Sequence, residues 1–243
     1  MRSAKTRLGE LDCVVVDALP EGARPELAVV LCHGLGAPPT DLVPLAPELV
    51  QLEPELGPKV RFVFPGAPLR VEMMGQRVPA WFPLPPEVLM GQERDWDKFA
   101  ASTPEGLAQA RRGLMSLLSE LSAATKLPYG RIVLGGFSQG AMLTTDVALR
   151  LEEAPAGLCI LSGSLICQDE WKQRAQKRKG MPVLQSHGRV DDILAFPQAE
   201  RLHTLLKDAG LPVEFLPFNG PHTISPEALE RMAEFLHDRL EKR

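Results

Sequence analysis

Short apolar segments alternate with segments of helical period along most of this chain, and that alternation limits the fold more than any other feature. The apolar segments are rich in Val, Leu and Ile and have the length of strands: residues 11–16, 27–32, 60–64, 132–135, 158–161, 183–186 and 213–216. Segments of helical period lie between or after the later ones: residues 104–125, 141–152, 170–178, 197–209 and 226–240. This order predicts an α/β fold with a mostly parallel central sheet, helices on both faces and right-handed crossovers, in which the first strand can pair antiparallel at an edge.

The chain shows no sign of a second domain. It has no repeat of fixed period, no low-complexity tract and no linker rich in Gly or Ser, so we expect residues 1–243 to form a single domain. Residues 65–96 break the alternation, because they are dense in Pro, Met and aromatic residues and have no clear period. Long loops in compact domains are usually functional, and this one is predicted to be a lid-like insertion; the alternative is an irregular insertion packed on the core.

Composition and charge exclude several classes of protein. Hydrophobic residues make up 44% and charged residues 24%, as in soluble globular proteins, and a formal net charge of −4 offers no field for nucleic acid or an anionic membrane surface. The basic N-terminus has no apolar stretch behind it, and no segment stays apolar long enough to span a bilayer, which predicts a cytoplasmic protein without integral membrane association. The four cysteines lack C-x-x-C spacing, so buried reduced thiols are expected rather than a metal site or a redox pair.

The sequence Gly-Phe-Ser-Gln-Gly at residues 136–140 lies between a predicted strand and a predicted helix. Ser138 is therefore expected on a very tight turn with its hydroxyl exposed, and Gly136 and Gly140 fall where a β-carbon would collide with the neighbouring strand or helix. The following helix directs its positive end at that hydroxyl, which favours a serine nucleophile. A dinucleotide-binding turn is the alternative, but the G-x-G-x-x-G spacing and an acidic residue at the end of the next strand are both missing.

A serine hydroxyl needs a histidine as base and a carboxylate that orients the histidine. In enzymes that carry the serine on a turn of this type, the three residues occur along the chain in the order serine, acid, histidine. His222 is the strongest candidate for the base, because it follows the last predicted strand on a loop of Asn, Gly and Pro. His187 closes a strand before a glycine and is more typical of a residue that shapes a turn. The remaining histidines after the serine lie in amphipathic helical segments and are expected to be solvated: His203 and His237.

The acid is expected on the loop after the preceding strand, where the sequence offers Asp191 and Asp192. Both cannot orient one imidazole, and either could instead cap the helix that follows. Asp169, on the loop after the strand before, is a weaker candidate that fits a helix cap. The residues alone leave this choice open.

Acyl transfer also needs two N–H donors for the oxyanion. The turn itself supplies the backbone N–H of Gln139, and the second donor should come from the loop after an early central strand. Residues 33–36, His-Gly-Leu-Gly, form such a loop, and their glycines let the N–H of Leu35 turn inward. His33 precedes the serine, fits the order of a base badly, and is expected to brace this loop.

Several motifs occur in one order along nearly the whole chain from about residue 27: His-Gly-Leu-Gly-Ala, Phe-Pro-Gly-Ala-Pro, Val-Pro-Ala-Trp-Phe, Gly-Phe-Ser-Gln-Gly-Ala, Leu-Ser-Gly, His-Gly-Arg-Val-Asp-Asp and Gly-Pro-His-Thr-Ile-Ser-Pro-Glu-Ala-Leu-Glu. In these motifs the chain resembles the phospholipase/carboxylesterase family of α/β-hydrolases, which includes bacterial carboxylesterases and acyl-protein thioesterases. The resemblance implies an α/β-hydrolase fold, a mechanism without metal or organic cofactor, and these roles: nucleophile Ser138, acid Asp191, base His222, oxyanion donors Leu35 and Gln139, and a wall of the acyl site formed by Trp81.

Two departures from the family pattern bear on the function. The acid motif at residues 187–196 lacks the family's usual ending, and the extra Asp192 leaves the choice of acid less certain. The lid-like stretch is longer than expected in thioesterases that act on large lipidated proteins. We therefore expect a serine carboxylesterase for small to medium, small-molecule or lipid-like acyl esters, because the lid-like stretch offers apolar side chains with little concentrated charge: Met73, Met74, Trp81, Phe82 and Leu84.

Two other functions stay open. Lysophospholipase or acyl-protein thioesterase activity is the alternative within the same class of enzyme. A non-catalytic ligand-binding protein on this fold is the alternative outside it, since a fold does not guarantee a function. Apolar residues in the lid-like stretch also leave a homodimer open.

Overall fold

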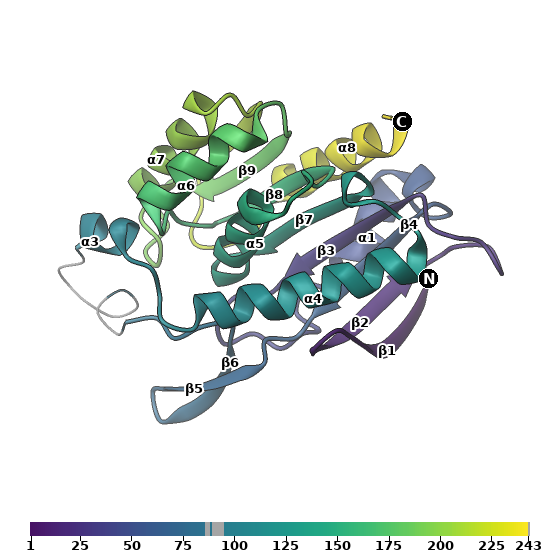
Figure 1. Cartoon of the computed structure of the whole chain (residues 1–243), viewed down its shortest axis with the longest axis horizontal. Coiled ribbons are helices and arrows are strands. Elements are labelled where there is room, and N and C mark those ends of the chain that lie inside the picture. The colour runs from purple at the N-terminus through teal and green to yellow at the C-terminus, as the bar shows by residue number, and fades with distance from the viewer. Residues whose placement is uncertain (86–87, 89–94, 243) are drawn as a thin grey trace.

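The computed structural model describes residues 1–85, 88 and 95–242, and these form a large central sheet and a separate hairpin (Figure 1). The order of strands in the sheet is β1-β2-β4-β3-β7-β8-β9-β10. Their bounds are β1 Arg2–Leu8, β2 Leu11–Asp17, β3 Leu27–Cys32, β4 Val60–Pro65, β7 Ile132–Phe137, β8 Gly157–Leu161, β9 Val183–Gly188 and β10 Val213–Phe218. All neighbours from β4 to β10 pair parallel, so the prediction of a mostly parallel sheet is confirmed.

Helices cover both faces of this sheet, as predicted (Figure 1). One face carries α1 Leu45–Leu52 and α8 Pro226–Glu241; the other carries α4 Leu107–Thr125, α5 Gln139–Arg150, α6 Gln168–Ala175 and α7 Phe196–Asp208. Strand β3 is buried along its whole length, with Val30 packed toward α4 and α5 and Val29 packed toward α1 and α8. A central strand covered on both sides needs apolar residues at every position, which explains its continuous apolar run.

The N-terminal edge of the sheet differs from the expectation. Strand β1 was not predicted, and it pairs antiparallel outside β2, so β2 pairs antiparallel on both sides and is not the edge. Residues 2–7 are all exposed, which removes the alternation of apolar and polar residues by which a strand is found. Charged side chains such as Lys5 and Arg7 are typical of an edge strand that must not pair with another chain.

The lid-like stretch contains a hairpin that the sequence did not predict, formed by β5 Leu69–Met73 and β6 Gln76–Ala80. Figure 1 shows it projecting from the body of the molecule. Its turn places both Met74 (φ 51°) and Gly75 (φ 75°) in the left-handed region. Such turns normally carry Asn or Gly at the first of these positions, and an exposed Met there hides the signal. The part of the predicted insertion at residues 86–87 and 89–94 lies outside the described residues.

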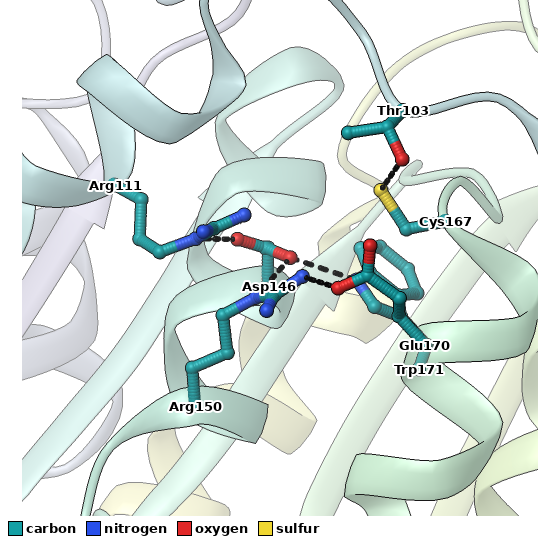
Figure 2. A network of polar contacts seen from close by, with 7 residues as sticks. All are labelled: Thr103, Arg111, Asp146, Arg150, Cys167, Glu170 and Trp171. Atoms are coloured by element: carbon teal, nitrogen blue, oxygen red, sulfur yellow. Dashed lines mark hydrogen bonds and ion pairs between the residues drawn. The ribbon is translucent and has the colours of Figure 1, made fainter.

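A buried carboxylate ties α5 to the helices on either side of it (Figure 2). Asp146 is fully buried and accepts hydrogen bonds from Arg111 of α4 at 2.5 Å, from Arg150 of α5 at 2.9 Å and from the indole N–H of Trp171 of α6 at 3.0 Å. Arg150 also pairs with Glu170. A carboxylate is tolerated in such a place because both of its oxygens are paired, and the network fixes the helix that follows Ser138.

Candidate active site

Ser138 stands at the junction of β7 and α5 in a strained backbone conformation. Its φ of 55° and ψ of −118° lie outside the regions that a side chain normally allows, while its N–H donates to the carbonyl oxygen of Leu161 at 2.9 Å. The residue is partly exposed, in contrast to the buried strand before it and the buried helix after it. Strain of this kind is found where a side chain must be presented at a fixed point.

The glycines on either side of Ser138 are required by close packing, as predicted. A β-carbon at Gly136 would lie 2.5 Å from the backbone carbon of Gly140, and one at Gly140 would lie 2.0 Å from the carbonyl oxygen of Cys32. Real contacts to a β-carbon are never this short, so any side chain at these positions would push β3, β7 and α5 apart. The turn can hold its shape only with both glycines.

We expect Gly140→Ala to lower the free energy of unfolding by about 3 kcal/mol or more, because the clash is with backbone and no rotamer relieves it. Urea denaturation measures this. Gly130→Ala is the matched control: no atom lies within 4 Å of its β-carbon position, so a change below about 1 kcal/mol is expected. If Gly140→Ala were as stable as the wild type, the backbone at Cys32 would have to move away from the new methyl group without a cost in free energy, which would contradict the packing argument.

His222 and Asp191, taken from different loops, form a close pair. The Nδ1 atom of His222 lies 2.6 Å from Oδ2 of Asp191. The imidazole of His222 also packs on the ring of Phe137, the residue before the serine, with 4.8 Å between ring centroids. Because Nδ1 is taken by the carboxylate, Nε2 is the nitrogen left to accept a proton.

Backbone and side-chain contacts hold the loop that carries His222. The hydroxyl of Ser162, at the end of β8, donates to the carbonyl oxygen of Thr223 at 2.9 Å. From the loop after β9, the N–H of Val190 donates to the carbonyl oxygen of Gly220 at 3.2 Å. The loop is thus attached on both sides of His222, to the segments that directly follow β8 and β9.

Asp191 is buried and accepts hydrogen bonds at both carboxylate oxygens. Oδ1 accepts from the N–H groups of Ile193 at 2.9 Å and Leu194 at 2.8 Å, and Oδ2 lies 3.1 Å from Nε2 of His187 in addition to His222. Burial alone would raise the pKa of Asp191, but the hydrogen bonds from His187, His222 and Leu194 outweigh it and hold the pKa well below its usual range. The carboxylate is therefore charged at neutral pH and able to stabilise an imidazolium.

His187 is a supporting residue that the sequence did not assign. It is fully buried, and its Nε2 lies 2.7 Å from the carbonyl oxygen of Leu194 as well as near Asp191. Since both neighbours are acceptors, Nε2 carries the proton. The other two candidate acids lie elsewhere: Asp192 is exposed, and Asp169 is exposed in the first turn of α6.

The loop after β3 lies against the serine. A β-carbon at Gly34 would be 3.4 Å from the β-carbon of Ser138. Among the described residues, no backbone carbonyl accepts from the N–H of Leu35. The N–H of Gln139, at the first position of α5, has no partner within the helix. The N–H groups of Leu35 and Gln139 therefore remain the expected oxyanion donors.

His33 braces this loop, as expected from its place in the sequence. Its Nε2 accepts from the N–H of Ala67 at 3.0 Å, so Nδ1 carries the proton and donates to the carbonyl oxygen of Gly34 at 2.8 Å. Burial lowers its pKa, which keeps the ring neutral. The two histidines expected to be solvated are partly buried instead: His203 stacks on Phe215 and His237 lies 3.7 Å from Glu53.

Trp81 was expected to form a wall of the acyl site, but its side chain is fully buried in the structure. Its indole N–H donates to the carbonyl oxygen of His33 at 2.8 Å, and its backbone N–H donates to the side-chain oxygen of Gln139 at 2.9 Å. Trp81 thus lies beneath the loop after β3 and supports it. The side chain of Gln139 is a second supporting group that the sequence did not indicate.

The described residues hold no metal-binding cluster and no exposed thiol. Residues 1–85, 88 and 95–242 bring together no group of three His, Cys, Asp or Glu side chains that could hold a metal ion. All four cysteines are buried and free, as predicted, and burial raises the pKa of the Cys159 thiol to about 12. No helix among the described residues is both long and apolar enough to cross a membrane.

Comparison with known proteins gives a consistent result. Residues 15–240 match the model of a family described as Phospholipase/Carboxylesterase. Acyl-protein thioesterase 1 of Eremothecium gossypii is 31% identical over 221 residues, which are 88% of each chain, and that of Candida albicans is 28% identical over 91% of this chain and 95% of its own. The crystal structure of esterase PE8 superposes with a TM-score of 0.76 at 26% identity, covering 98% of this chain and 99% of the other.

Proposed function

This chain belongs to the phospholipase/carboxylesterase family of α/β-hydrolases and is a serine hydrolase. We propose that it is a carboxylesterase that cleaves small to medium acyl esters through Ser138, His222 and Asp191. The observation that carries the proposal is the hydrogen bond of 2.6 Å between His222 and Asp191. The imidazole of this pair packs on Phe137, which directly precedes the strained residue Ser138. Strain at the serine and an ionised partner for the imidazole are typical of catalytic sites.

In the proposed reaction, Nε2 of His222 takes the proton of the Ser138 hydroxyl as its oxygen attacks the ester carbonyl carbon. The carbonyl oxygen becomes an oxyanion, which the N–H groups of Leu35 and Gln139 stabilise. Asp191 holds Nδ1–H of the imidazole and offsets the positive charge that the ring acquires. The imidazolium then protonates the leaving alkoxide, and the acyl group stays on Ser138.

Deacylation repeats these steps with water. His222 takes a proton from a water molecule, whose oxygen attacks the acyl carbon, and the second oxyanion occupies the same place. Collapse breaks the bond to the serine oxygen, which regains its proton from His222, and the carboxylic acid leaves. The cycle consumes one ester and one water and requires neither metal nor organic cofactor.

The hairpin supports an apolar acyl group as the substrate part bound next to the serine. Met73 lies at the end of β5 with its methyl group 3.7 Å from the β-carbon position of Gly36, which belongs to the loop after β3 (residues 33–36, the oxyanion loop). Leu69, Val71 and Met73 alternate with exposed polar residues along β5, so the hairpin has one half-buried apolar face. An apolar wall next to the oxyanion loop suits an alkyl chain better than a charged group.

Acyl-protein thioesterase activity is the second candidate, because the curated relatives carry that name at up to 31% identity. A panel of p-nitrophenyl esters from acetate to palmitate, with matched thioesters, separates the two. We expect kcat/KM for butyrate and octanoate to exceed that for palmitate by about 10-fold or more. Turnover confined to long-chain thioesters would favour the thioesterase. A folded protein that hydrolyses none of these compounds and resists labelling by a fluorophosphonate would be a binding protein instead.

A further inference from the structure

We propose that the side chain of Gln139 is a positioning group for the oxyanion hole, acting through residues 79–82. The carboxamide holds that segment against α5, and the segment in turn holds the loop that presents the N–H of Leu35. This inference rests on the proposed function, because it assigns a second task to a residue whose backbone N–H is one of the two donors.

The first observation is that both the oxygen and the nitrogen of the buried Gln139 carboxamide form hydrogen bonds to backbone groups. Gln139 is the first residue of α5, a position from which side chains usually reach solvent, yet it is fully buried. Its Oε1 accepts from the N–H of Trp81 at 2.9 Å and its Nε2 donates to the carbonyl oxygen of Phe82 at 2.7 Å. A buried segment that presents one N–H and one C=O to the same neighbour needs a donor and an acceptor side by side, and a carboxamide of this length supplies both.

The second observation is that the same segment grips the oxyanion loop on both sides of Leu35. Before Leu35, the carbonyl oxygen of His33 accepts from the indole N–H of Trp81 at 2.8 Å. After Leu35, the N–H of Gly36 donates to the carbonyl oxygen of Pro79 at 2.8 Å. The direction of the N–H of Leu35 is therefore fixed by two bonds to the segment that Gln139 holds.

These contacts predict an effect on the transition state and not on binding. An oxyanion forms only as the carbonyl is attacked, so a donor that is out of place raises the barrier while the ground-state ester binds as before. The His222–Asp191 pair lies on other loops and shares none of these four hydrogen bonds. Displacement of the N–H of Leu35 should therefore lower kcat. It should change neither KM nor the pH profile, which is set by the base.

The test is Gln139→Met, which keeps the length of the side chain and the helix propensity but removes both hydrogen bonds. We expect kcat on the best ester of the panel to fall about 10- to 100-fold with KM within about 3-fold of wild type. A trifluoromethyl ketone with the same acyl group forms an oxyanion on the serine, so its Ki should rise by the same factor as kcat/KM falls. A purely structural role would lower Tm and move neither kcat nor this Ki.

Two further variants sharpen the result. Gln185→Met is the matched control, because Gln185 is also fully buried and donates to the backbone carbonyl of Ala199 at 2.8 Å; it should lose stability and keep kcat and Ki. Trp81→Phe removes the indole N–H that donates to His33, together with part of the buried ring, and should lower kcat in the same way, which keeps the test valid if Gln139→Met does not fold.

The outcomes separate this inference from the proposed function. Wild-type kcat and Ki in a folded Gln139→Met, or in Trp81→Phe if the first does not fold, would overturn the positioning role and leave the esterase proposal intact. A folded wild type that hydrolyses no ester and takes no fluorophosphonate would overturn both.

Discussion

Ser138→Ala should lower kcat for ester hydrolysis by about 10⁶-fold and abolish labelling by a fluorophosphonate, because the variant has no oxygen to attack a carbonyl or a phosphorus centre. The rest of the site stays in place, so substrate binding and some stabilisation of the oxyanion persist. Alanine must adopt the same strained φ of 55°, so we expect the free energy of unfolding to change by less than about 1 kcal/mol. Labelling followed by intact mass, together with burst kinetics, measures the effect.

Ser164→Ala is the matched control for that substitution. Its hydroxyl is buried near the end of β8 and has no hydrogen-bond partner among the described residues, so its loss should leave turnover within about 3-fold of wild type. Labelling that persists in Ser138→Ala would place the nucleophile on another residue and end the proposed mechanism.

The parts of the site that the sequence predicts are those carried by local patterns. The strand, the two glycines and the helix around Ser138 place the serine without knowledge of the rest of the fold, since the turn cannot close with any other residues at 136 and 140. The alternation of strands and helices likewise predicts that the central strands are parallel, because parallel strands require crossovers. Position at a strand end also singled out His222 and the pair of aspartates.

The parts that it does not predict depend on contacts between distant segments. Gln139 meets Trp81 across 58 residues of sequence, and Asp146 meets Arg111 across 35, and neither pair has a local signature. Trp81 illustrates the consequence, because the family resemblance implied a wall for the substrate, whereas in the structure its side chain is fully buried and bonded to the oxyanion loop. Strand β1 and the hairpin turn at Met74 were missed for a local reason. Strand β1 lacks the alternation of apolar and polar residues by which a strand is found, and the turn has Met74 where Asn or Gly is usual.

Asp191→Asn should lower kcat by about 10⁴-fold while the protein keeps its fold. The reason lies in the four hydrogen bonds that the carboxylate accepts. The oxygen at Oδ1 accepts from the backbone N–H groups of Ile193 and Leu194, which are fixed donors, so an asparagine must keep its oxygen there and turn its NH₂ toward the imidazoles. His222 can then meet it only by accepting at Nδ1, which places its proton on Nε2. In that tautomer Nε2 cannot take the proton of Ser138.

Asp192→Asn is the control, since it removes the same charge one residue further along from an exposed side chain. It should keep kcat within about 3-fold of wild type, because solvent screens the electrostatic effect of an exposed side chain. Steady-state kinetics on one ester for both variants decides between the two aspartates. A large loss in Asp192→Asn with near wild-type turnover in Asp191→Asn would require the loop after β9 to rearrange in solution, and it would move the role of the acid to Asp192.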